Sequence, residues 1–138
     1  MDKERILSKF KELEEYLEEL EQIKPTDFEE YVNSIEKKRA CERLVHVSIE
    51  CTIDICNIII SELKAGIPID EENTFEKLEN RKVISKGMKD MLIEMKGMRN
   101  VLVHKYGEVK DEIIFEVISD KLQDFDKFKE EILKFLKK

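Results

Sequence analysis

The sequence predicts an all-α protein, an antiparallel four-helix bundle, and two observations predict it. Apolar residues recur at helical spacing along four long stretches. Helix-breaking residues are rare, with four glycines and two prolines among 138 positions. Long helices joined by short connections pack antiparallel, and a chain of this length is typical of one domain. We therefore expect residues 1–138 to form a single helical domain.

The first helix is predicted from Asp2 to Ile23, with one apolar stripe facing the core. Pro25 cannot continue a helix, and either Thr26 or Asp27 can cap the next one. The stripe consists of Leu7, Phe10, Leu13, Leu17 and Leu20.

The second helix is predicted from Phe28 to about Ala65, with a bend near Ser34. It is apolar on more than one face, which predicts a central position or a contribution to a subunit interface. The segment Gly66–Pro68 ends it. Its core positions are Leu44, Val45, Val47, Ile49, Ile53, Ile55, Ile58, Ile59 and Ile60.

Cysteine use and hydropathy indicate a reduced, soluble environment. Cys41, Cys51 and Cys56 are an odd number within helical pattern, which is typical of core thiols in a cytoplasmic protein. Without a Cys-x2-Cys pair, His46 completes no ligand set, so no metal site is expected. No uninterrupted apolar run reaches the ~18 residues of a membrane span. We therefore expect neither a membrane span nor a signal peptide.

After the second helix, residues 69–80 are predicted to form a loop with a short helical turn around Thr74–Leu78. The third long helix carries a methionine-rich stripe typical of a core and ends at Gly107. Asp111 can cap the last helix. The stripes of these two helices are Met88, Met91, Leu92, Met95, Met98 and Leu102, then Ile114, Val117, Ile118, Leu122, Phe125, Phe128, Ile132 and Phe135.

The end of the third helix concentrates polar side chains. At about 100° per residue, Arg99 and Tyr106 lie almost on one line of the helix, and Asn100 and His104 form a second line beside it. Arg99 and His104 diverge by roughly 140°, so one helix does not present a finished site. The alternative is structural: His104 caps helix carbonyls, the arginine pairs with a carboxylate and the tyrosine is half-buried.

Two carboxylates four residues apart interrupt the apolar second helix. One of them, Glu50 or Asp54, is expected to hold Arg99 or His104 in place, because an acid beside a buried cation is stabilised by it. The alternative is a pair of partly exposed acids without a role in the site.

The net charge of −7 argues against indiscriminate nucleic-acid binding. Between Arg81 and Lys110, however, the sequence contains eight basic residues and three acids, so this segment has a net charge of +5. The rest of the chain has a net charge of −12. Such a localised patch can hold a phosphate backbone, and we expect Lys96, Lys105 and Lys110 to bind RNA there. The alternative is ordinary salt-bridge patterning along helices.

The pattern Arg99-x4-His104-x-Tyr106, with polar Asn100 directly after the arginine, resembles the signature of the HEPN superfamily, specifically of its HepT-type toxins. The resemblance covers most of the chain. Besides the motif it includes Arg39–Leu44, Ile49–Glu50, Asp54–Asn57, Phe75–Leu78 and Val83–Ile84.

This resemblance implies a homodimeric, metal-independent ribonuclease, the toxin of a toxin–antitoxin pair, with its motif at the dimer cleft. Arg99 and His104 are then catalytic and Asn100 supports them. It also implies that the partner antitoxin, a minimal nucleotidyltransferase of the MntA type, inactivates the toxin by AMPylation of Tyr106. RNA is the expected substrate; neither DNA nor a cofactor is expected.

The residue types suit this chemistry. Histidine exchanges protons near neutral pH, and arginine grips two phosphate oxygens. One motif histidine per chain supplies one proton carrier, whereas the reaction needs a base and an acid; a symmetric dimer supplies both. The alternative function is a non-catalytic helical module that binds a nucleotidyltransferase and a nucleotide. A further alternative is a plain dimeric bundle whose motif only caps a helix.

Overall fold

A computed structural model describes residues 1–104 and 110–138, with only the backbone of His104. All regular secondary structure in these residues is helical. The elements are α1 (Lys3–Ile23), α2 (Phe28–Asn33), α3 (Ile35–Leu63), α4 (Glu71–Asn80), α5 (Lys86–His104), α6 (Asp111–Glu116), the π-helical turn η1 (Val117–Lys121) and α7 (Gln123–Leu136).

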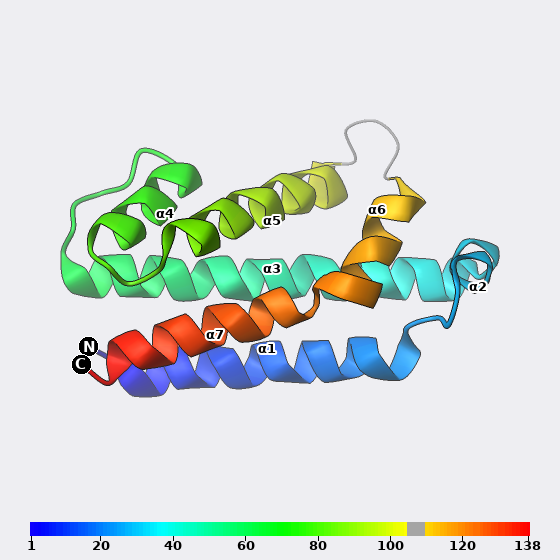
Figure 1. Ribbon diagram of the computed structural model, residues 1–138, viewed down its shortest axis with the longest axis horizontal. Coiled ribbons are helices and arrows are strands. Elements are labelled where there is room, and N and C mark those ends of the chain that lie inside the picture. The colour runs from blue at the N-terminus through cyan, green and yellow to red at the C-terminus, as the bar shows by residue number, and fades with distance from the viewer. Residues whose placement is uncertain (105–109) are drawn as a thin grey trace.

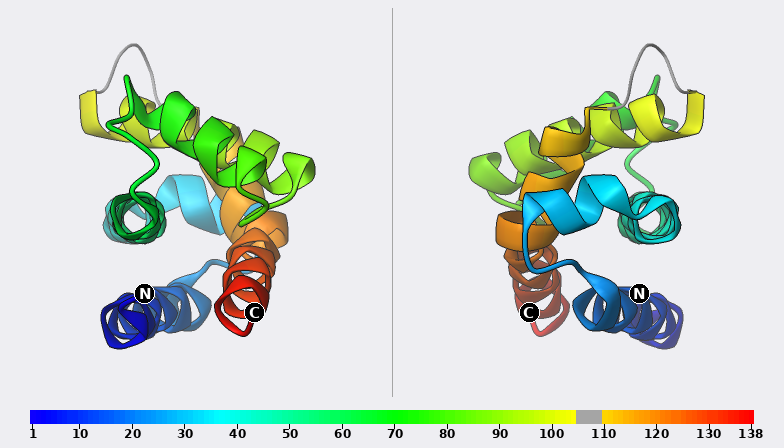
Figure 2. Two further views of the ribbon diagram at one scale, coloured as in Figure 1. Left: turned by 90° about the vertical axis from the view of Figure 1, so that its left-hand side faces the viewer. Right: turned by 90° about the vertical axis from the view of Figure 1, so that its right-hand side faces the viewer.

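Four rows of helix run antiparallel in chain order, which confirms the predicted bundle (Figure 1). Helix α3 lies between α1 on one side and α4 with α5 on the other, and α6, η1 and α7 form the fourth row (Figure 2). Both chain ends lie at one end of the bundle, whereas α5 ends and α6 begins near the other (Figure 1).

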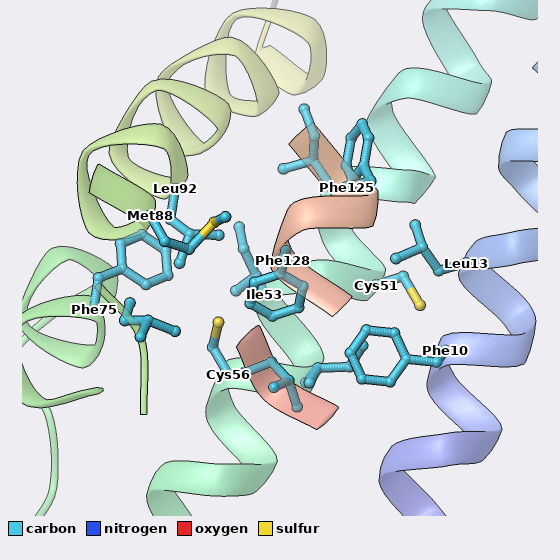
Figure 3. Close-up of a cluster of buried hydrophobic side chains, with 14 of the residues drawn as sticks. Phe10, Leu13, Cys51, Ile53, Cys56, Phe75, Met88, Leu92, Phe125 and Phe128 are labelled. Carbon is cyan, nitrogen blue, oxygen red and sulfur yellow. The ribbon is translucent and has the colours of Figure 1, made fainter. Parts of the chain in front are cut away.

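The core forms around α3, whose apolar residues face several neighbours at once. Phe10 of α1 and Phe128 of α7 pack with ring centroids 5.9 Å apart. On the other side of α3, Phe75, Met88 and Leu92 complete the apolar cluster shown in Figure 3. By length and composition α3 could cross a membrane, but most of that stretch is buried inside the bundle. Its apolarity is accounted for by core packing.

The described cysteines are buried and free, as a reduced core requires. Burial raises the pKa of the Cys51 thiol to about 11, and the nearby Glu12 carboxylate acts in the same direction. Burial likewise raises the pKa of Cys56 well above its ordinary value. Both thiols are therefore protonated near neutral pH and serve as small apolar groups.

Helix starts follow side-chain caps. Asp27 accepts a hydrogen bond from the backbone N–H of Glu30 at 2.8 Å and caps α2. Ser34 takes an extended conformation and caps α3 through the N–H of Lys37, at 3.2 Å. The predicted bend near Ser34 is therefore a complete break between two helices.

The prediction of a loop with one turn over residues 69–80 is wrong, because α4 is a helix of ten residues. Asp70 caps it by accepting a hydrogen bond from the N–H of Asn73 at 2.8 Å. Thr74, Phe75 and Leu78 bury one face of α4. Docking of this face on the bundle stabilises a helix too short to form alone.

The cap predicted for the last helix is also wrong. Asp111 lies in the first turn of α6, and its carboxylate pairs with Lys38 of α3 at 3.0 Å. Lys110 holds the cap position without a side-chain hydrogen bond. Further along, η1 interrupts the predicted continuous helix and separates α6 from α7.

Candidate functional site

Arg99 is the centre of a polar site built from three helices. Its side chain is 14% exposed, and three of its N–H groups donate. Nε donates to Oδ1 of Asn100 at 3.0 Å, Nη1 to Oε1 of Glu50 on α3 at 2.6 Å, and Nη2 to Glu71 on α4. We call Arg99, Asn100, Glu50 and Glu71 the Arg99 cluster.

The Arg99 cluster keeps the guanidinium charged. Burial alone would lower the pKa of Arg99, but the hydrogen bond to Glu50 and the charges of Glu71 and Glu50 outweigh it, so this pKa lies above its ordinary value. One cation and two carboxylates give the cluster a formal charge of −1. A bound anion must therefore be attracted by Arg99 against the field of both acids.

His46 extends this network. From the sequence it was considered only as a metal ligand. Nε2 of His46 lies 3.6 Å from the carboxylate of Glu50, one turn further along α3. Nδ1 of His46 lies 3.2 Å from Nη1 of Arg43. The spacing of Arg43, His46 and Glu50 along one helix face was the available signal.

Of the two predicted acids, the structure brings only Glu50 to Arg99. Asp54 pairs with Lys9 of α1 at 3.4 Å instead. Four residues along a helix turn a side chain by about 40° and shift it by about 6 Å, which directs Asp54 toward α1. A place for Asp54 beside Arg99 is therefore contradicted.

Glu71 was missed because residues 69–80 were expected to be a loop. It is the first residue of α4, where a carboxylate also interacts favourably with the helix dipole. The acidic run Asp70-Glu71-Glu72 was the available signal for a helix start. What the sequence lacks is any indication that α4 packs beside α5.

The remaining motif residues lie at the limit of the described chain. His104 is the last residue of α5, and the helix is continuous from Arg99 to it. Lys105 and Tyr106 lie outside the described residues. The expected divergence of Arg99 and His104 stays a prediction, because the side chain of His104 lies outside the described part of the chain.

The basic patch is weaker than the residue count suggested. Lys89 pairs with Glu79 at 3.0 Å, and Arg99 is held by two acids. Lys96 is partly exposed and Lys110 is exposed. Both are therefore accessible to an anionic ligand.

An apolar groove of about 290 Å³ runs between α5 and α6. Val101 and Ile113, two of its lining residues, are 36% and 47% exposed. Glu94 and Lys110 contribute charged side chains to the lining. Apolar surface of this kind beside a polar motif is typical of an interaction surface.

No group of three or more His, Cys, Asp or Glu side chains within residues 1–104 and 110–138 is arranged to hold a metal ion. The described site itself presents a fixed guanidinium, two carboxylates and an amide. These groups bind and orient an anion such as a phosphate.

Comparison with known proteins identifies the family. A family model described as "Ribonuclease HepT-like" matches residues 13–132. This chain belongs to the ribonuclease HepT-like family. The match includes α3, α4 and α5, and with them every residue of the Arg99 cluster.

Two curated relatives are named as nucleases. The chain is 27% identical over 121 residues to the "tRNA nuclease HepT" of Aphanizomenon flos-aquae, covering 88% of this chain and 82% of that protein. It is 35% identical over 79 residues to the "mRNA nuclease HepT" of Shewanella oneidensis, covering 57% of this chain and 59% of that protein.

Solved structures agree on the fold. The tri-AMPylated HEPN toxin of Shewanella oneidensis, in complex with its MNT antitoxin, superposes with a TM-score of 0.88 and 25% identity. The superposition covers 97% of this chain and 99% of that one. The HepT-like chain described here is thus an all-helical ribonuclease of the toxin class.

Proposed function

We propose that this HepT-like ribonuclease cleaves RNA without a metal ion, through Arg99 and His104 at the cleft of a homodimer. The observation that carries the proposal is the fixed guanidinium of Arg99, held from α3, α4 and α5. It precedes His104 by five residues on one continuous helix.

The proposed reaction is an internal transesterification. His104 removes the proton of a ribose 2′-hydroxyl, and this oxygen forms a bond to the adjacent phosphorus. The bond from phosphorus to the 5′-oxygen breaks, and that oxygen takes a proton from an acid. Arg99 stabilises the charge that develops on the phosphoryl oxygens. The products are a 2′,3′-cyclic phosphate and a free 5′-hydroxyl.

A homodimer supplies the second proton carrier, because two copies of α5 bring two histidines to one cleft. Exposed apolar side chains on α5 and α6, among them Val101, Val103 and Ile113, are suited to an interface. Light scattering at micromolar concentration is expected to give the mass of a dimer. A stable monomer that cleaves RNA contradicts this arrangement.

RNA binding is assigned to the lysines around the motif, Lys96, Lys105 and Lys110. The relatives are named for different RNA classes, so the cleavage assay should contain both tRNA and mRNA. Duplex DNA lacks the 2′-hydroxyl and serves as the uncleaved control. We expect the protein to act in the cytoplasm.

The decisive experiment combines the purified protein with RNA in excess EDTA. Cleavage should persist and leave 2′,3′-cyclic ends. His104→Ala should abolish it, whereas Lys11→Ala, a change at an exposed position of α1, should leave it intact. Activity that is lost in EDTA and restored by magnesium contradicts the mechanism.

We further propose that Tyr106 is AMPylated by a cognate nucleotidyltransferase antitoxin. The support is the Shewanella structure, described as a tri-AMPylated toxin with its MNT antitoxin. Tyr106 follows His104 by two residues, and each added AMP carries a phosphate charge that competes with RNA for Arg99.

Tyr106→Phe should still cleave RNA, because no proton transfer is assigned to the hydroxyl. Incubation of the wild type with the antitoxin and ATP should add AMP-sized mass increments and stop cleavage, and Tyr106→Phe should show neither effect. Increments that persist in Tyr106→Phe assign the modification elsewhere. If the purified protein binds the antitoxin but never cleaves RNA, the non-catalytic module is the better description.

A further inference from the structure

The mechanism above uses the fixed guanidinium of Arg99 but gives Glu71 no separate role. Arg99 and Glu71 are 28 positions apart in sequence and meet only because α4 folds beside α5. The inference drawn from this contact rests on the proposed ribonuclease function.

A guanidinium has five N–H groups, and the Arg99 cluster engages three of them. Asn100 accepts from Nε, Glu50 from Nη1 and Glu71 from Nη2, so each of the three nitrogens has one partner. The other N–H of Nη1 and of Nη2 have no partner among the described residues, and these two can donate to a phosphate.

Each acid alone would leave the guanidinium free to turn. Glu50 belongs to the middle of α3, the long core helix, and Glu71 to the first turn of α4. Their carboxylates are 37% and 32% exposed at the side chain, so both remain solvated on one side. Without Glu71 the guanidinium is held only at Nε and Nη1, and Nη2 has no acid partner to fix it.

We propose that Glu71 is a positioning residue for RNA cleavage: it holds the Arg99 guanidinium in the plane that faces the reacting phosphate. It acts through Arg99 and touches neither the scissile bond nor the proton carriers. The second negative charge also weakens phosphate binding, because the cluster is left with a formal charge of −1. Glu71 thus favours the correct orientation over tight binding of RNA.

This assignment predicts opposite effects on binding and on rate. Glu71→Gln removes one negative charge, so KM for RNA should fall by about threefold to tenfold. The neutral amide holds Nη2 less firmly, so kcat should fall by about tenfold. Partial unfolding cannot produce this pair of effects, because it does not tighten binding.

Two further variants separate charge from position. Glu71→Asp keeps the charge and shortens the side chain by one methylene group, so kcat should fall while KM stays near the wild-type value. Glu72→Gln makes the same charge change on the next, exposed residue of α4 and should alter neither constant by more than about twofold.

The test is a set of steady-state and single-turnover cleavage measurements on full-length wild type, Glu71→Gln, Glu71→Asp, Glu72→Gln and Arg99→Ala. Melting curves should agree within about 3 °C among the three glutamate variants. In an Arg99→Ala background, adding Glu71→Gln should change the residual rate by less than about twofold, because positioning through Arg99 is no longer possible.

The outcomes distinguish the positioning role of Glu71 from the ribonuclease mechanism. If Arg99→Ala abolishes cleavage while Glu71→Gln behaves like Glu72→Gln, the positioning role is overturned and the ribonuclease mechanism stands. A fall in kcat for Glu71→Gln of equal size with and without Arg99 also overturns it. If Arg99→Ala cleaves RNA like the wild type, both proposals fail.

Discussion

The two sides of α3 are held by different interactions. Toward α1 and α7 the contacts are mainly apolar, as in the rings of Phe10 and Phe128 at 5.9 Å, with one partly exposed ion pair between Asp54 and Lys9. Toward α4 and α5, beside a similar apolar layer, α3 supplies Glu50 to a partly buried arginine. Packing toward α1 and α7 needs apolar side chains of suitable size. The contact with Arg99 needs particular polar atoms within hydrogen-bond distance. Stability and chemistry are therefore supported by different neighbours of one helix.

The largest effect is expected on the apolar side. Phe128→Ala removes a fully buried ring of α7 that packs on Phe10 of α1, which should lower the free energy of unfolding by about 3–5 kcal/mol. Urea unfolding monitored by circular dichroism measures it. The fraction that stays folded should cleave RNA at the wild-type rate, and a slower rate per folded molecule would break the separation of the two sides.

Arg99→Ala tests the polar side. Removing the only cation of the Arg99 cluster should slow single-turnover cleavage about 100-fold to 1000-fold, equivalent to about 3–4 kcal/mol of transition-state stabilisation. The free energy of unfolding should change by less than about 1 kcal/mol, because both acids are about one-third exposed and can be hydrated. Quench-flow cleavage paired with urea unfolding checks both values.

Glu50→Gln should have an intermediate effect, since it keeps the shape of the side chain and removes its charge. We expect single-turnover cleavage to slow by about tenfold through a loosened Arg99. His46 also loses its charged neighbour, the Glu50 carboxylate 3.6 Å away. An unchanged rate would mean that Asn100 and Glu71 suffice to hold Arg99.

The smallest effect is expected from Asp54→Asn, the matched change four residues along α3. Asp54 is half exposed and pairs with Lys9 on the apolar side. Stability should change by less than about 0.5 kcal/mol, and RNA cleavage should be unaffected. A rate loss comparable to that of Glu50→Gln would show that the two sides are coupled through α3.

The sequence predicted the helices whose apolar residues recur at helical spacing. The four rows of helix follow from apolar stripes, and the match of Asp27 to its cap position follows from a local rule. The short α4 was missed because a helix of this length is not stable alone. It depends on packing of Thr74, Phe75 and Leu78 against the bundle.

For the site, the sequence supplied Arg99 and Glu50 but left open whether Glu50 or Asp54 would reach the arginine. The choice depends on where α5 crosses α3, which no local pattern contains. Glu71 was out of reach for the same reason, since its contact joins residues 28 apart. Long-range polar contacts depend on helix packing to within an ångström, and apolar stripes do not.

The π-helical turn η1 has a consequence for chain length. Its backbone closes rings one residue wider than those of an α-helix, so it contains one residue more than a continuous helix would need. Deleting one residue from Val117–Lys121 would let α6 and α7 join into a single regular helix. Because the wide turn absorbs the extra residue, removing it leaves the helices on either side facing as before, so Ile114 and Phe125 should both stay in the core. The fourth row is therefore a place where a single-residue deletion should be tolerated without a change in the buried face.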